Sequence, residues 1–436
     1  MSAASLRLDQ APPFSVPLRF FLTAPLFPLL AAGVLGWNGP AALVSRWTPA
    51  MLAITHLFTL GFLSMVMLGA LMQLLPVLAG SPVKRPTRVG GLVHALLTLG
   101  TIGLALGFLG AQPVLLRASL ALLGGGFAIF LAAAGSSLTR AISDNPAVNP
   151  MRLALLALAF TVTLGLALGL RLSGSTTGVA GGAWTDVHLG WGLIGWVGVL
   201  VMGVAYQVVP MFQLTPAYPA WLMRGFPWFV SIVLLAWSLS AMLAASSAFF
   251  AVVADMLSIF LGLGLVVFAF TTLWLQHRRR RRLPDVTLFF WRLAMLSLLA
   301  CIVLGLAPLI GFDSWPRAEL LLGAWMIVGF ASSAIHGMLY KIVPFLAWLH
   351  LHRTHNIQYA LPNMKEIMPD ARTLPHLWVH GACLVLISLA ILRPGFWVYP
   401  AAAAIALSYA WLAANLWSAS RLYNRILQSR SETDVA

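Results

Sequence analysis

Charged residues are scarce in this chain. Asp, Glu, Lys and Arg make up 8% of its 436 residues, whereas a soluble domain carries about 25%. Hydrophobic residues make up 60%. This balance excludes a soluble globular protein and a disordered chain, because neither exposes so little charge to water. The composition therefore indicates an integral membrane protein.

Cysteine is almost absent as well. The two cysteines, Cys301 and Cys383, lie in apolar runs, and the sequence contains no CxxC motif. This excludes a disulfide scaffold and a covalently attached c-type heme. We interpret both side chains as small buried hydrophobes.

Twelve segments are apolar and reach the roughly 20 residues that a membrane-spanning helix needs. They lie near residues 18–36, 50–79, 90–110, 114–140, 151–171, 184–212, 225–245, 247–276, 287–311, 319–350, 374–393 and 397–427. Residues 1–17 lack a basic start followed at once by an apolar core, so we interpret them as an N-terminal tail rather than a cleaved signal peptide. Residues 428–436 form the C-terminal tail.

The distribution of basic residues predicts the orientation in the membrane. Of the 26 Lys and Arg, twenty fall on the side of the two termini and five on the other side, while Lys341 falls inside a span. Because cytoplasmic loops collect Lys and Arg, both termini are expected on the cytoplasmic side of the membrane. We expect that membrane to be a bacterial inner membrane. The net charge of +15, including the HRRRRR run at 277–282, therefore points to the lipid bilayer as partner and not to nucleic acid.

A short pattern recurs in spans 2, 6 and 10. It reads GALMQLLP at 69–76, GVAYQVVP at 203–210 and GMLYKIVP at 337–344, with a constant spacing of 134 residues. Equal spacing indicates an internal repeat. We therefore predict one all-α membrane domain over 1–436, with twelve transmembrane helices in three pseudo-threefold four-helix repeats near 18–140, 151–276 and 287–427.

The polar position of this pattern is Gln73, Gln207 or Lys341, and Tyr206 and Tyr340 precede it in two repeats. A polar group inside a membrane needs a partner. We expect these five residues to line a polar cavity on the repeat axis, with Lys341 directed at an acceptor, the cavity or the cytoplasmic interface. The alternative for Lys341 is a lysine that snorkels toward the interface.

Three further motifs contain histidine in spans 2, 6 and 10: THLFTLGF at 55–62, VHLGWGLIGW at 187–196 and HGMLYKIVPFLAWLH at 336–350. With twelve spans in three arcs, they resemble subunit I of the heme-copper oxidase superfamily, in particular its divergent NnrS-like and cbb-type subunit I-like branch. The resemblance implies heme ligation by His56 in span 2 and by a span 10 histidine, matched by His336. Span 7 has no histidine, so an intact oxygen-reducing copper–heme centre is not expected, and whether the protein is an enzyme is left open.

The depth of each histidine limits which can share a metal. Measured from the Gly of each repeat, His56 and His188 differ by two residues, about 3 Å, and His56 and His336 by twelve, about 18 Å. His56 is therefore expected to pair with His188 if it faces span 6, or with Met326 if it faces span 10, since His/Met ligation of heme is ordinary. His56, His188 and His336 are the candidate heme or copper ligands, and hydrogen bonding across helices is the alternative.

A second histidine group is expected at the cytoplasmic ends of spans 10 and 11. It comprises His350, His352, His355, His376 and His380. His376 and His380 share a helix face because they are four residues apart. A metal site is one interpretation, but polar residues at the membrane interface are the one we favour.

We predict from these features a multi-pass membrane protein that binds heme, with copper as a second candidate cofactor. The resemblance implies a role in respiratory or nitrosative-stress physiology, with electrons from quinol or a redox partner protein. One alternative is a transporter or metallochaperone for copper, heme or a small solute. Another is a quinol- or NO-linked redox enzyme.

Overall fold

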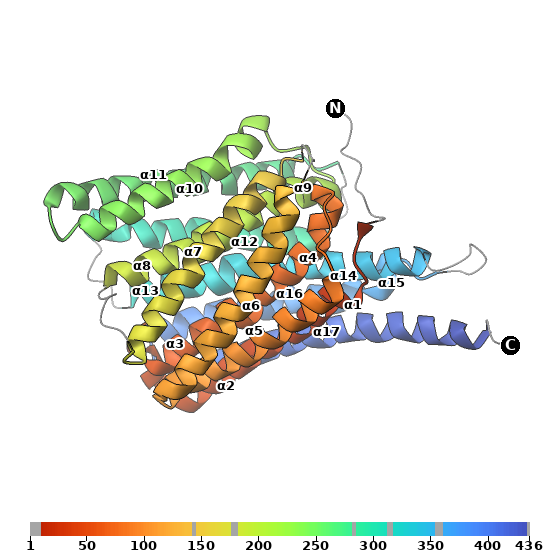
Figure 1. Cartoon of the computed structure of the whole chain (residues 1–436), viewed down its shortest axis with the longest axis horizontal. Helices are drawn as coiled ribbons and strands as arrows, with labels where there is room; N and C mark the ends of the chain where they lie inside the picture. The colour runs from red at the N-terminus through yellow and green to blue at the C-terminus, as the bar shows by residue number, and fades with distance from the viewer. Residues whose placement is uncertain are drawn as a thin grey trace.

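The structure is a computed structural model that describes residues 10–141, 145–175, 182–280, 285–311, 317–353 and 361–433. Within these residues it contains only helices and their connections (Figure 1). Twelve helices are long and apolar enough to cross a membrane, which confirms the predicted number of spans. They run over Ser15–Leu43, Pro49–Ala79, Pro86–Leu109, Pro113–Thr139, Val148–Leu172, Gly182–Gln213, Ala220–Leu243, Ala248–His277, Val286–Leu309, Ala318–His352, Asp370–Leu392 and Val398–Gln428.

Some spans consist of several helical segments. Span 1 contains α1 (Ser15–Thr23), α2 (Leu26–Asn38) and η2 (Gly39–Leu43), and span 2 contains α3 (Pro49–His56), η3 (Leu57–Ser64) and α4 (Met65–Ala79). Span 6 contains α8 (Gly182–Gly190), η4 (Trp191–Gly198) and α9 (Val199–Gln213), and span 10 contains α13 (Ala318–Ala324), η6 (Trp325–Ser332) and α14 (Ser333–Arg353). The others are α5 (Pro86–Leu109), α6 (Pro113–Thr139), α7 (Val148–Leu172), α10 (Ala220–Leu243), α11 (Ala248–His277), α12 (Val286–Leu306) with η5 (Ala307–Ile310), α16 (Asp370–Leu392) and α17 (Val398–Thr433), and the short α15 spans Met364–Ile367.

The last span returns to the first and closes the bundle. The Trp417 Nε1 group of α17 donates to the Leu22 carbonyl of α1 at 3.3 Å, and the Phe14 and Tyr423 rings meet edge to face at 4.9 Å. We call the end where α1 begins and α14 and α17 end the terminal end. The other end, where α3, α8 and α13 begin, is the opposite end. Which end faces the cytoplasm stays a prediction.

Three segments of π-helix lie at corresponding places in spans 2, 6 and 10. These are η3, η4 and η6, each of eight residues, and each begins 134 residues after the one before. Trp196 Nε1 of η4 donates to Ser64 Oγ of η3 at 3.3 Å, and η6 contacts both other segments. Runs of π-helix are rare and occur often at functional sites. The π-helical segments therefore recur with the same 134-residue spacing as the sequence pattern.

We call spans 1–4, 5–8 and 9–12 the first, second and third units. Repeated glycines bring spans 2, 6 and 10 each close to the first span of its own unit. The glycines are Gly61 and Gly69, Gly195 and Gly203, and Gly329 and Gly337. A Cβ added to Gly69 would lie 2.7 Å from Phe20 of α1, and one added to Gly337 would lie 3.0 Å from Phe290 of α12. At Gly203 it would overlap Pro150 of α7. Small residues allow such close helix contacts in lipid.

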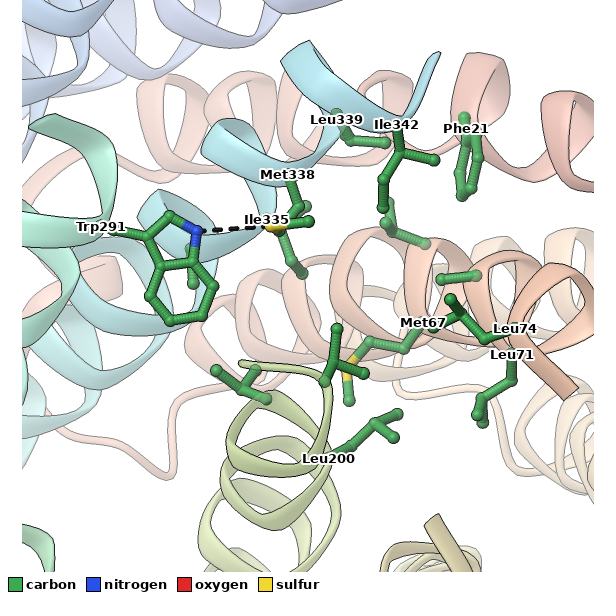
Figure 2. Close-up of a pocket in the computed structure, with 15 residues that line it drawn as sticks. Phe21, Met67, Leu71, Leu74, Leu200, Trp291, Ile335, Met338, Leu339 and Ile342 are labelled. Atoms are coloured by element: carbon green, nitrogen blue, oxygen red, sulfur yellow. Dashed lines mark hydrogen bonds between the residues drawn. The ribbon is translucent and has the colours of Figure 1, made fainter. Parts of the chain in front are cut away.

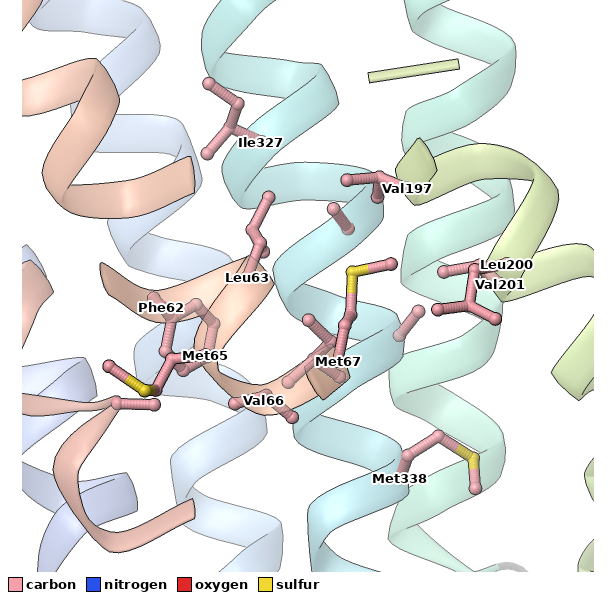
Figure 3. Close-up of a cluster of buried hydrophobic side chains, with 14 of the residues drawn as sticks. Phe62, Leu63, Met65, Val66, Met67, Val197, Leu200, Val201, Ile327 and Met338 are labelled. Atoms are coloured by element: carbon pink, nitrogen blue, oxygen red, sulfur yellow. The ribbon is translucent and has the colours of Figure 1, made fainter. Parts of the chain in front are cut away.

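Apolar side chains fill the region where spans 2, 6 and 10 meet (Figure 3). Leu63 of η3, Val197 of η4 and Met338 of α14 belong to this cluster and are at most 9% exposed. Spans 2, 6 and 10 therefore adjoin at the centre of the bundle. The finer prediction, an oxidase-like arrangement of three arcs, stays a prediction.

Candidate functional site

His56 and His188 lie toward the opposite end, on spans 2 and 6. His56 Nδ1 is 2.8 Å from the Leu52 carbonyl of its own helix. His188 Nδ1 is 3.0 Å from the Thr161 carbonyl of α7. A carbonyl oxygen can only accept, so each Nδ1 carries the hydrogen and each Nε2 offers its lone pair.

The two imidazoles lie within electrostatic range of each other, and both are half-buried. The missing side chain of Gly165 on α7 makes room for one of them, because a Cβ there would lie 2.9 Å from His188 Cε1. The His56 ring packs on Phe108 of α5, with 5.4 Å between centroids. Helices of the first two units thus hold both histidines toward the same end of the bundle. Met326, the other predicted partner of His56, is buried within η6.

His336 of α14 lies elsewhere, in the interior of the third unit. It is 0% exposed, and neither ring nitrogen has a hydrogen-bond partner. The His380 and His376 rings lie 4.4 and 5.1 Å from it, centroid to centroid. A buried polar group without a partner costs about 1–3 kcal/mol. His336 is therefore the least satisfied side chain in this region.

His376 and His380 face the interior, and their interpretation as interface residues is wrong. Both are 0% exposed. The physical reason is that the buried face of α16 runs through these two residues and continues at Leu384 and Ile387. The segments η6, α14 and α17 supply their hydrogen-bond partners.

His350 and His352 stay at the terminal end and do not join this group. His350 Nδ1 lies 2.9 Å from the Leu346 carbonyl, and its ring stacks on Phe14 at 5.5 Å. His352 Nδ1 lies 2.8 Å from the Trp348 carbonyl. His355 lies outside the described residues. The four described histidines of this group thus divide between the interior, with His376 and His380, and the terminal end, with His350 and His352.

Two small cavities of about 60 and 50 Å³ lie between α4, α9 and α14. The first has an apolar lining, and beside it Trp291 Nε1 lies 3.4 Å from Met338 Sδ (Figure 2). Gln73 and Gln207 line the second. Gln73 is 4% exposed, and its Oε1 has no partner. These cavities have room for a few small molecules such as water.

The other three residues predicted for an axial cavity have partners elsewhere. Lys341 forms an ion pair with Asp285 at the start of α12. The Tyr206 hydroxyl donates to the Leu222 carbonyl of α10 at 3.2 Å. The Tyr340 hydroxyl lies 2.7 Å from His376 Nδ1. Of these five residues, the structure therefore brings only the two glutamines together at one cavity.

An ion-pair group at the opposite end joins all three units, and sequence reasoning missed it. Arg46 Nη1 donates to Asp186 Oδ1 at 2.7 Å, and Arg46 Nε lies 3.0 Å from Glu319 Oε2 without hydrogen-bond geometry. Arg317 Nε also donates to the Leu43 carbonyl at 3.1 Å. Asp186 and Glu319 occur near the starts of spans 6 and 10, 133 residues apart. This near-repeat spacing is the sequence feature from which the ion-pair group could have been predicted.

No group of three His, Cys, Asp or Glu side chains in the described part of the chain is placed to hold a metal ion. A heme iron needs only two axial ligands from the protein. His56 and His188 are thus the pair whose chemistry fits such a group, since each keeps one nitrogen on a carbonyl and leaves the other available. No family model and no curated protein matches the chain.

Proposed function

We propose that this multi-pass membrane protein binds a transition-metal centre, heme iron or copper, between His56 and His188. One observation carries the proposal: each imidazole donates Nδ1–H to a main-chain carbonyl and presents Nε2. Histidines that ligate metals almost always donate their other ring N–H in this way, which fixes the tautomer and raises the basicity of the ligating nitrogen. Two helices from different units supply the pair.

The chain's own residues account for the orientation of this pair. The Leu52 carbonyl holds the His56 ring from within its helix, and the Thr161 carbonyl holds the His188 ring from the neighbouring helix. Gly165 leaves the space that the His188 ring occupies. When bound, the metal centre supplies one-electron redox chemistry. A role in respiratory or nitrosative-stress physiology follows from the resemblance to the heme-copper oxidase superfamily and is part of the proposal.

The alternative of a copper or heme transporter has less support. Its route would run along the axis past Gln73 and Gln207, where the two cavities are small and one has an apolar lining. Heme is far larger than either cavity, and Cu(I) prefers soft sulfur ligands or imidazole. A quinol- or NO-linked redox activity stays an alternative that would use the same proposed centre.

The test is optical and elemental analysis of the full chain purified from cells supplied with heme and copper. A Soret band identifies heme, and stoichiometric copper without that band identifies copper. We expect the signal to disappear in His56→Ala and in His188→Ala and to persist in His352→Ala, whose side chain is exposed at the terminal end. Wild-type protein with neither heme nor copper, also after addition of hemin or Cu(I) to the purified sample, would refute the proposal.

A further inference from the structure

An unbroken chain of hydrogen bonds runs through the third unit, across α14, α16 and α17. Asn415 Nδ2 donates to the Tyr340 oxygen at 2.9 Å, and Tyr340 Oη lies 2.7 Å from His376 Nδ1. Ser408 Oγ lies 3.2 Å from His376 Nε2 and 3.2 Å from His380 Nδ1. His380 Nε2 then lies 3.2 Å from the Val328 carbonyl. We call these five side chains the relay.

The two ends of the relay determine where every hydrogen lies. Asn415 Nδ2 can only donate, and it also faces the Arg372 carbonyl at 3.4 Å, which fixes the orientation of the amide. The Val328 carbonyl can only accept. Consequently Tyr340 donates to His376 Nδ1, and both imidazoles carry their hydrogen on Nε2. All hydrogens point inward, from the terminal end toward η6.

The relay connects the protein surface to the interior of the bundle. Its five side chains are at most 5% exposed, whereas Arg372, next to its outer end, is exposed. At the inner end, Ser333 Oγ lies 3.1 Å from His380 Nε2. Ser333 precedes His336 by three residues, so the two share a face of α14. His336 is the group without partners at that end.

Packing alone does not require these polar groups. In the second unit, Phe226 and Val230 lie as far from the start of α10 as His376 and His380 lie from the start of α16. Tyr206, which precedes Tyr340 by 134 residues, donates to a carbonyl instead. The same kind of helix packs there with apolar side chains. A buried polar network is costly unless it is fully bonded, so the relay indicates a function beyond packing.

Among the described residues, uncharged side chains surround the middle of the relay, so no full charge there would hold a proton at an intermediate point. The rings against His336 and the relay are Phe62 of η3, Phe290 of α12 and Tyr409 of α17. The buried cysteines on these helices are Cys383 of α16 and Cys301 of α12, and both thiols are neutral groups of the ordinary kind. Lys341, adjacent to Tyr340 in the chain, is neutralised by its ion pair with Asp285.

We infer that the relay is a proton-transfer path from the terminal end of the bundle to His336. A proton entering at the Tyr340 oxygen moves the Tyr340 hydrogen to His376 Nδ1, the His376 Nε2 hydrogen to Ser408, and the Ser408 hydrogen to His380 Nδ1. The His380 Nε2 hydrogen passes to Ser333. The last transfer, of the Ser333 hydroxyl hydrogen to His336, requires a rotation that brings the hydroxyl to a His336 ring nitrogen, because no hydrogen bond joins the two side chains in the structure. One proton enters and one arrives, and only O–H and N–H bonds change. Rotation of the hydroxyls and rings resets the path, and none of this depends on the metal centre proposed at His56 and His188.

The test is hydrogen–deuterium exchange at the histidine ring nitrogens, followed by NMR in the full-length chain labelled with ¹⁵N-histidine in lipid nanodiscs. Wild-type protein is expected to have Nε2–H tautomers at His376 and His380 and to exchange these buried protons. Tyr340→Phe and Ser408→Ala each remove one hydroxyl link without adding bulk. Each is expected to slow exchange at His380 and His336 by about tenfold or more, the effect of losing one hydrogen bond of 1.4 kcal/mol.

Two matched variants serve as controls. Tyr206→Phe removes the corresponding hydroxyl in the second unit, and Ser388→Ala removes a serine hydroxyl of α16 outside the relay. Both are expected to exchange at the wild-type rate. Wild-type exchange in Tyr340→Phe and Ser408→Ala would overturn the inference. Equal slowing or acceleration in all four variants would also overturn it, because it would indicate a general change in packing.

Discussion

Lys341 of α14 and Asp285 at the start of α12 form an ion pair. Their side chains are 18% and 12% exposed, so water screens the pair only in part. Asp285 also caps α12 by accepting from the Thr287 N–H at 3.0 Å. The first two units carry Gln73 and Gln207 at the position of Lys341. Lys341 is therefore compatible with its position inside span 10 because the residue that caps the first helix of its own repeat supplies a carboxylate.

Removing one partner of this pair is expected to cost more than removing both. Asp285→Asn keeps a capping side chain but leaves the Lys341 ammonium unpaired, which we expect to lower the free energy of unfolding by about 2 kcal/mol. Lys341→Gln installs the residue of the other two units and should cost less. The double variant should recover part of the loss. Thermal unfolding of the four proteins in detergent measures the coupling, and strictly additive effects would contradict the pairing.

The same pair predicts a loss of stability in acid. Burial raises the pKa of Asp285, but the Lys341 charge and hydrogen bonds from Lys341 and Thr287 lower it more, so the pKa lies below its ordinary value of 3.8. A carboxylate with a lowered pKa stabilises the folded state fully above its ordinary pKa and loses this effect as the pH falls below it. We expect the stability difference between wild type and the double variant to be constant from neutral pH down to about pH 5 and to shrink below about pH 4. Unfolding temperatures across this range measure it, and a difference independent of pH would count against the ion pair.

Close packing of the repeated glycines is testable at Gly203. An alanine there would overlap Pro150, whose rigid ring cannot turn away. We expect Gly203→Ala to destabilise the protein by about 1–3 kcal/mol. Gly135→Ala is the control, because no atom lies within 4 Å of a Cβ at that helical position, and it should be neutral or slightly stabilising. Equal unfolding temperatures for the two variants would contradict this account.

The distribution of basic residues predicts that the terminal end faces the cytoplasm. Gln112 at the opposite end and Thr139 at the terminal end are both exposed. In a background without Cys301 and Cys383, we expect a membrane-impermeant maleimide to label Gln112→Cys in intact cells. Thr139→Cys should be labelled only after the cells are permeabilised. The reverse labelling pattern would refute the predicted orientation.

Sequence reasoning predicted the spans well but not the directions of side chains. Depth along the helix suggested that His56 and His188 lie at one level, and the structure brings them into electrostatic range. The assumed rotation of 100° per residue does not hold between His56 and Gly69, because η3 is a π-helix with a wider turn. Azimuths derived from the sequence therefore have no firm basis at His56 or His188, nor at Met326, which lies inside η6.

The relay was beyond sequence reasoning for a different reason. Tyr340, His376 and Ser408 are separated by more than thirty residues from one to the next, and their contacts depend on which face α16 and α17 turn inward. From the sequence, a histidine pair spaced i,i+4 near a helix end is equally compatible with an exposed polar face and with a buried one. Only the neighbouring helices determine that this face is buried.

The sequence by itself determined that this is a membrane protein with twelve spans, because length and hydropathy alone decide whether a helix can cross lipid. It also determined the 134-residue spacing, at which the glycines and π-helical segments recur. The tertiary structure decided which polar groups meet: Lys341 with Asp285, Arg46 with Asp186 and Glu319, and three histidines around one buried centre. A buried polar side chain is costly without a partner, and for these groups the partner comes from another helix at a position that no local pattern reveals.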